Sequence, residues 1–221
     1  MQLTSRSHVD RFGSTYSREH HSALSAGVSA ALAWRSQIRK DLVQRRLAAG
    51  AAERAAWSTA IDQHLLRAWP NPPGRVIAFC WPYKAAHDVR TVIERWIPMG
   101  ALAAMPVVVI PTLPLIFRRW HAGALEPGAL GRPAPSDGPE IRPDTILLPA
   151  NGFDASGYRL GYGAGYFERT IAALRPNIRV IGIAYEIGRL PSIRPQSHDE
   201  PMDVVVTEKG VHDCVAGTRA A

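Results

Sequence analysis

Apolar and polar positions recur along the chain with two periods, one typical of helices and one typical of strands. Residues 30–68 are rich in helix formers, contain no proline and place Ile38 and Leu42 on one helical face. Gly50 interrupts this stretch where a C-terminal cap is expected, and Pro70 ends it, which predicts two helices. Farther on, short apolar runs alternate with helical spacing. The predicted strands are 75–81, 101–110, 117–120, 145–149, 179–185 and 203–207, the last closing the chain; the predicted helices between them are 88–100 and 166–174, and residues 123–143, dense in Gly and Pro, are predicted to be loop or hairpin.

This order of elements predicts an α/β fold, a single-domain open, mainly parallel sheet with helices on both faces. A chain of 221 residues fits one such domain, which we place at residues 34–215. Residues 1–33, whose first part is rich in Ser, His and Arg, are predicted to form a flexible N-terminal tail. Ligand sites in such folds lie beyond the carboxyl ends of the strands, so we look for the site there.

Composition narrows the class of protein but does not select a ligand. The net charge of +7 favours anionic partners, such as phosphates, polyglutamate or nucleic acid. Cys80 and Cys214 lack metal-ligand spacing, which fits a reducing, cytoplasmic compartment. The longest apolar stretch, 105–116, is broken by prolines and is shorter than the ~20 residues that span a bilayer. We therefore expect a monomer in the cytoplasm with no membrane partner.

The segment 151–169 is the candidate site, because it lies between a predicted strand and a predicted helix and holds five glycines. A glycine-rich loop leaves backbone N–H groups uncovered, so that they and the following helix N-terminus can hold phosphate oxygens. Arg159 can add a bidentate contact. The segment fits neither the GxxxxGK[ST] loop nor a GxGxxG fingerprint, so spacing alone leaves phosphate binding and a structural turn as alternatives.

The stretch Phe153-Asp-x-x-Gly-x-Arg-Leu-Gly-x-Gly-x-Gly-Tyr166 resembles the signature of the 5-formyltetrahydrofolate cyclo-ligase family, also called methenyltetrahydrofolate synthetase. Segments 35–39, 79–88 and 190–208 are similar to the family in order and spacing, and the likeness spans about residues 34–211. The resemblance implies ATP- and Mg²⁺-dependent conversion of 5-formyltetrahydrofolate to 5,10-methenyltetrahydrofolate, with release of ADP and phosphate. Nucleic acid is then not an expected partner.

Residue roles follow from the same resemblance, position by position. It implies a catalytic role for Arg159 and Tyr166 and magnesium binding by Glu168 and Asp199. It implies nucleotide binding by Arg35, Arg39, Arg159, Leu160, Gly161, Tyr162, Gly163, Ala164, Gly165, Tyr166 and Phe167, and folate contacts by Phe79, Trp81, Asp88 and Tyr166. For Phe79 and Trp81, packing in the core is an equal alternative.

Three departures from the family pattern leave other functions open. Ala164 stands where a basic residue is common, Glu168 where aspartate is usual, and Ala86 where a substrate-contacting glutamate is expected, for which Asp88 is the candidate substitute. One alternative is a family paralogue that uses ATP to activate a different small molecule. The other is a non-catalytic basic module with an RNA-binding or regulatory role, suggested by the positive net charge and by the alternating aromatic and basic residues of 117–121. A structural strand is the competing interpretation of that segment.

Overall fold

The computed structural model describes residues 13–121, 125–128 and 132–214. The chain divides between Ile38 and Arg39 into two units, each described by itself. In the first unit the described residues belong to helix α1 (Gly13–Ala48), which includes much of the predicted tail. Residues 1–12 of that tail lie outside the described residues. The predicted flexibility of the tail stays a prediction.

The second unit is built on a seven-stranded sheet of order β11-β10-β9-β6-β1-β2-β3. The five inner strands are parallel, and each edge strand is antiparallel to its neighbour. Two short hairpins, β4–β5 and β7–β8, lie outside this sheet. The strands are β1 (Val76–Phe79), β2 (Leu102–Val107), β3 (Ile116–Arg119), β4 (Leu125–Pro127), β5 (Pro133–Pro135), β6 (Thr145–Pro149), β7 (Gly152–Phe153), β8 (Arg159–Leu160), β9 (Arg179–Ile183), β10 (Val204–Thr207) and β11 (Gly210–Asp213).

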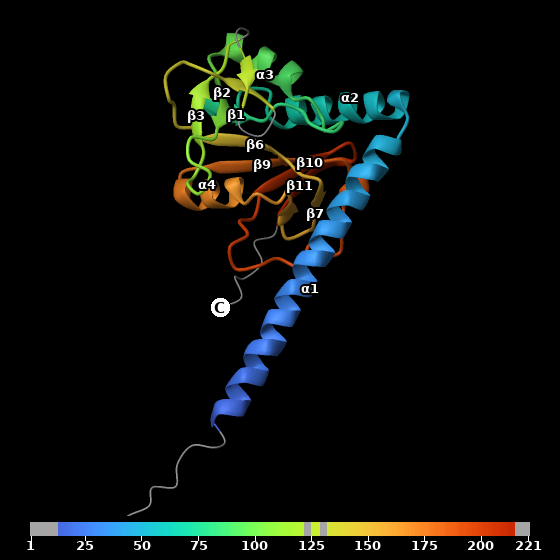
Figure 1. Ribbon diagram of the computed structural model, residues 1–221. Helices are drawn as coiled ribbons and strands as arrows, with labels where there is room; N and C mark the ends of the chain where they lie inside the picture. The colour runs from blue at the N-terminus through green and yellow to red at the C-terminus, as the bar shows by residue number, and fades with distance from the viewer. Residues whose placement is uncertain (1–12, 122–124, 129–131, 215–221) are drawn as a thin grey trace, which may run out of the picture. The chain divides into compact units, whose positions relative to one another are not determined.

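Helices cover both faces of the sheet (Figure 1). On β1, Ile77 and Phe79 belong to one hydrophobic core, whereas Ala78 between them belongs to the other. This strict alternation follows from the two-residue period of a strand. The first core is closed by α2 (Ala51–Ala68) and α3 (Arg90–Trp96), and the second by α4 (Tyr166–Leu174). Two short 3₁₀ helices complete the fold, η1 (Ile97–Met99) and η2 (Glu186–Gly188).

Most predicted elements are confirmed, but the short strands β7, β8 and β11 were missed. The fold class, the helix break at Gly50, the strand 145–149 and the helix 166–174 are as predicted. The predicted loop or hairpin at 123–143 contains the hairpin β4–β5. The prediction that 203–207 is the last strand was wrong, because Gly210, at φ 143°, begins β11, which returns antiparallel to β10. No helix among the described residues is both long and apolar enough to cross a membrane.

Candidate functional site

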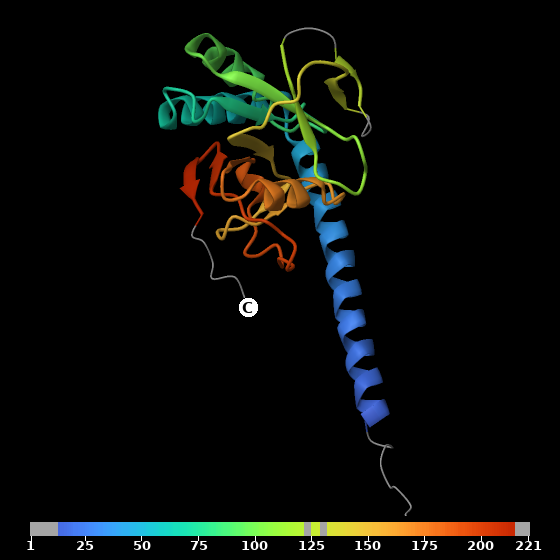
Figure 2. The same cartoon turned by 90° about the vertical axis from the view of Figure 1, so that its left-hand side faces the viewer.

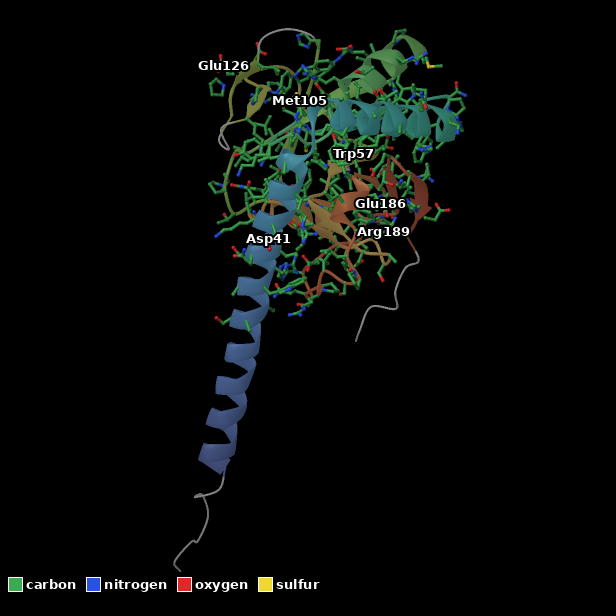
Figure 3. The ribbon with its side chains drawn as sticks, turned by 90° about the vertical axis from the view of Figure 1, so that its right-hand side faces the viewer. Asp41, Trp57, Met105, Glu126, Glu186 and Arg189 are labelled. Atoms are coloured by element: carbon green, nitrogen blue, oxygen red, sulfur yellow. The ribbon has the colours of Figure 1, made fainter. Side chains whose placement is uncertain are left out.

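A pocket lies where the parallel strands β1, β2 and β6 reach their carboxyl ends, the position predicted from the fold class. Met105 on β2, labelled in Figure 3, lines it from the sheet. The glycine-rich loop and the β4–β5 hairpin form its other walls. Its lining residues are 80, 81, 105–108, 115, 128, 132–134, 149, 159 and 161–168.

The first half of the glycine-rich segment builds a turn that carries the second half into the pocket. The Asp154 carboxylate accepts hydrogen bonds from the backbone N–H groups of Ser156 and Tyr158, both at 3.1 Å, and from that of Ile193 at 3.0 Å. Gly157 has φ 84°, a conformation that a side chain disfavours. These contacts close the hairpin β7–β8 and place Arg159 at the start of β8. Phe153 and Asp154 therefore have a structural role.

Three glycines allow side chains to approach the loop backbone closely. A Cβ atom at Gly161 would lie 2.2 Å from Arg159 Nη1, and one at Gly163 would lie 3.2 Å from Arg39 Nη1. Gly163 and Gly165 have φ values of 93° and 67°, in the left-handed region. The glycine spacing therefore reflects both turn geometry and close approach. Arg39 lies against the loop, and its nucleotide-binding role stays a prediction.

Arg159 and Glu168 form an ion pair inside this pocket. Arg159 Nη2 lies 3.0 Å from Glu168 Oε1, and only 5% of the arginine side chain is exposed. Glu168 is in the first turn of α4, whose N-cap Gly165 provides no side-chain cap for the helix. The first N–H groups of a helix lack intrahelical acceptors and attract anions. Arg159 and this helix start together favour a phosphate group.

Most of the residues predicted to bind nucleotide line the pocket, namely Arg159 and residues 161–167. Tyr166 is among them, with the Arg169 guanidinium 5.1 Å from the centre of its ring. Leu160 is fully buried, and its carbonyl oxygen accepts a hydrogen bond from the Asn151 N–H at 2.9 Å. Arg35 lies in the first unit, so its predicted role stays a prediction.

The residues predicted to contact folate are dispersed. Trp81 lines the pocket, with the Arg90 guanidinium 4.0 Å above its ring. Phe79 is fully buried and packs edge-on against Trp120. It therefore follows the alternative of packing in the core, which the sequence left open. Asp88 accepts a hydrogen bond from Arg90 Nε at 2.9 Å. Burial raises the Asp88 pKa, but hydrogen bonds and charge from Arg90 outweigh it and hold that pKa below its usual value.

The two predicted magnesium ligands occupy different surroundings. Glu168 lines the pocket, whereas Asp199 is buried in the connection between η2 and β10, where its carboxylate accepts the Gln196 N–H at 2.7 Å. Among the described residues, no group of three or more His, Cys, Asp or Glu side chains is arranged to hold a metal ion. Mg²⁺ commonly binds one or two carboxylates together with substrate phosphates, so Glu168 beside a phosphate site fits this ion.

Three residues near the glycine loop were missed from the sequence. Arg46 is buried and donates hydrogen bonds to Lys84 O at 2.9 Å and to Asn151 Oδ1 at 3.1 Å. Arg132 reaches the pocket from the β4–β5 hairpin, and Cys80 from the end of β1. Burial raises the pKa of the Cys80 thiol to about 12, with partial opposition from the charges of Arg132 and Arg159. Only the folded arrangement brings these segments together.

The segment 117–121 was interpreted either as an RNA-binding strand or as a structural strand. The structure agrees with a structural strand, β3. Phe117 and Trp120 are buried in the two cores. The Arg118 side chain donates to the carbonyl oxygen of Ser136. These buried aromatic rings are not available to stack on bases, which removes one of the two observations that suggested an RNA-binding module and leaves the positive net charge.

Comparison with known proteins agrees with this geometry. The profile of the 5-formyltetrahydrofolate cyclo-ligase family matches residues 31–208. A protein of Mycolicibacterium smegmatis named 5-formyltetrahydrofolate cyclo-ligase is 30% identical over 191 residues, covering 79% of this chain and 94% of that protein. One of the same name from Mycoplasma pneumoniae is 24% identical over 176 residues, covering 79% of this chain and 99% of that protein.

Two solved structures share the fold. The NMR structure of Aquifex aeolicus 5,10-methenyltetrahydrofolate synthetase has a TM-score of 0.71 at 26% identity, covering 85% of this chain and 96% of that one. The structure of a 5,10-methenyltetrahydrofolate synthetase from Mycoplasma pneumoniae has a TM-score of 0.64 at 25% identity, covering 79% of this chain and 98% of that one. The match over 31–208 exceeds half of the chain, and the chain therefore belongs to the 5-formyltetrahydrofolate cyclo-ligase family.

Proposed function

We propose that this protein converts 5-formyltetrahydrofolate to 5,10-methenyltetrahydrofolate with ATP and Mg²⁺, releasing ADP and phosphate. The observation that carries the proposal is the pocket at the strand ends, where the Gly161–Gly165 loop, Arg159 and the start of α4 converge. Such a site binds phosphates by backbone N–H groups and charge, and the family supplies the reaction.

The chemistry requires that a poor leaving group be activated. The formamide oxygen takes the terminal phosphoryl group of ATP, breaking its bond to the ADP oxygen and giving an iminium phosphate. The folate N10 amine then attacks the activated carbon, closes the ring and expels phosphate. The protein must align ATP with the formyl oxygen and stabilise the charge that develops.

The residues of the pocket suit these tasks. Arg159 offers a planar guanidinium that binds phosphate oxygens, and its burial strengthens each contact by excluding water. Trp81 and Tyr166 supply aromatic walls for a planar pterin near the same loop. Glu168 would share a magnesium ion with the phosphates, and that ion, when bound, neutralises phosphate charge. Asp199 stays a proposed second carboxylate.

The test supplies purified protein with 5-formyltetrahydrofolate, ATP and Mg²⁺. Formation of methenyltetrahydrofolate is then monitored by the near-ultraviolet absorbance of this product. We expect product from the wild type and a loss of at least about a hundredfold in kcat/KM for Arg159→Ala. Arg179→Ala removes the same charge from an exposed strand position and serves as the matched control, with activity unchanged.

ATP binding measured in parallel separates the alternatives. Binding of ATP without methenyl product would contradict the folate reaction and support a paralogue that activates a different small molecule. A protein that neither binds ATP nor forms product would contradict the assignment of the glycine loop itself.

A further inference from the structure

The β4–β5 hairpin contributes a cation to the pocket from outside the family's signature segment. The Arg132 guanidinium carbon lies 4.7 Å from the centre of the Tyr83 ring and 4.5 Å from that of Tyr162. The two rings meet edge to face, with centroids 5.2 Å apart and planes at 71°. Arg132 is thus held at the faces of two aromatic rings that meet beside the glycine loop.

Other side chains fix these rings in place. The Tyr162 hydroxyl donates to Tyr83 O at 3.1 Å and accepts from Arg46 Nη2 at 3.3 Å. Arg46 is buried and also donates to Lys84 O, so the 83–84 backbone and the loop are joined through one arginine. A guanidinium stacked on fixed rings loses little further freedom on binding a ligand, and its N–H edges stay available.

Among the described residues, no carboxylate forms an ion pair with Arg132, and its buried Nε atom has no hydrogen-bond acceptor. Arg132, Arg159 and Cys80 all line this pocket. Burial raises the pKa of the Cys80 thiol, and the charges of the two arginines lower it in part. Two guanidinium groups that line one pocket favour an anion with several oxygens.

The loop itself cannot supply this charge. Residues 161–167 read Gly-Tyr-Gly-Ala-Gly-Tyr-Phe and contain no basic side chain, and Ala164 occupies the position where a basic residue is common in the family. Tyr162, two residues before Ala164, is one of the rings that hold Arg132.

We propose that Arg132, held between Tyr83 and Tyr162, is the second guanidinium that binds the nucleotide phosphates and takes over the role that Ala164 cannot perform. This inference rests on the proposed function, in that it takes the anion to be the phosphate chain of ATP. It assigns a phosphate-binding role to a residue of a hairpin that the sequence shows only as a loop dense in Gly and Pro.

The experiment measures ATP affinity by isothermal titration calorimetry in Mg²⁺-containing buffer, independently of folate turnover. For Arg132→Ala we expect an affinity about 10- to 100-fold weaker, the effect of losing one charge-assisted contact. Ala164→Lys in the Arg132→Ala background should recover most of that loss, because it returns a cation to the loop. Arg142→Ala removes an exposed charge of the same sign and should leave the affinity within twofold.

The outcomes are decisive. Weakened ATP binding with unchanged adenosine binding, reversed by Ala164→Lys, supports the assignment. An ATP affinity within twofold of wild type in both Arg132→Ala and Arg132→Gln overturns the assignment. It is also overturned if ATP and adenosine affinity fall together and Ala164→Lys does not restore them, because a residue with a purely structural role gives that pattern. Failure of wild type to bind ATP overturns both proposals. ATP binding without folate turnover overturns only the proposed reaction and leaves the Arg132 comparison valid.

Discussion

Adding one methyl group at Gly161 should displace Arg159 from its working position. The backbone at Gly161 does not lie in the left-handed region, so alanine is tolerated there without backbone strain. Its Cβ atom would nevertheless lie 2.2 Å from Arg159 Nη1 and 3.2 Å from Cζ. Because normal contact distances begin at about 3.5 Å, the guanidinium must move by about 1 Å. The change acts on a flexible side chain in the pocket and leaves the fold in place.

The size of the effect follows from the proposed role of Arg159. The shift lengthens its 3.0 Å contact with Glu168 and moves the charge that would meet the phosphates. A misplacement of about 1 Å in a catalytic site can cost about a hundredfold in rate, and we expect kcat/KM to fall by that order. Stability should fall by up to about 1.5–3 kcal/mol, the contribution of one charge-assisted hydrogen bond.

The assay is product absorbance at saturating Mg²⁺, with thermal unfolding recorded for each variant. Gly50→Ala is the matched control, because nothing lies within 4 Å of a Cβ atom there, and its activity should be that of wild type. A double-mutant cycle isolates the mechanism: in an Arg159→Ala background, Gly161→Ala should have no further effect on turnover. Wild-type turnover in Gly161→Ala, or a further loss in the double variant, would refute the reasoning.

Three further predictions concern neighbouring residues. Arg90 holds the Asp88 pKa below its ordinary value of 3.8, so the pairing stabilises the fold above that pH. This stabilisation is lost as the pH falls through the lowered pKa of the folded state. In urea unfolding, Asp88→Asn should be less stable than wild type at pH 7, and the difference should vanish in acid. Arg46→Met leaves buried acceptors unpaired and should lower the unfolding free energy by about 2–4 kcal/mol and perturb Tyr162, as checked by chemical denaturation and tyrosine fluorescence. Cys80, with its pKa raised to about 12 by burial, should resist iodoacetamide in the native protein at pH 8, and modification located at Cys80 by peptide mass spectrometry would contradict its burial, whereas the less buried Cys214 serves as the internal comparison.

The sequence predicted the sheet well because its inner strands are buried on both faces. Strands such as Thr145–Pro149 read as continuous apolar runs, and their parallel order follows from the helices between them. The edge strand Gly210–Asp213 escaped detection because it is short, has no buried residue, and contains one apolar residue, Val211, which is exposed. The two-residue strands β7 and β8 are held by the Asp154 turn and show no periodicity of their own.

The site was predicted where residues adjacent in sequence act together, and was missed where the fold joins distant segments. Arg159 and the following loop were found because they form one motif. Arg132 lies in a region whose composition indicates only a turn, and Arg46 lies on a helix where a basic residue is ordinarily exposed. Nothing in spacing separates either from the many surface arginines. Their positions depend on contacts with residues distant in sequence, since Arg46 bonds to Asn151 and Tyr162 and Arg132 lies over the Tyr83 and Tyr162 rings.

The glycine loop depends on this packing for its shape as well as its charge. Glycine makes the required turns accessible but also leaves the backbone with many alternative conformations, so the loop must be ordered by contacts from other segments. Asn151 Nδ2 donates to Gly161 O at 3.2 Å, and Arg169 Nη2 donates to Pro111 O at 3.0 Å, where the β2–β3 connection approaches α4 (Figure 2). The Arg39 guanidinium lies against Gly163. The motif therefore supplies backbone groups that can surround a phosphate, while residues outside the motif hold those groups in place in advance of the nucleotide binding that we propose.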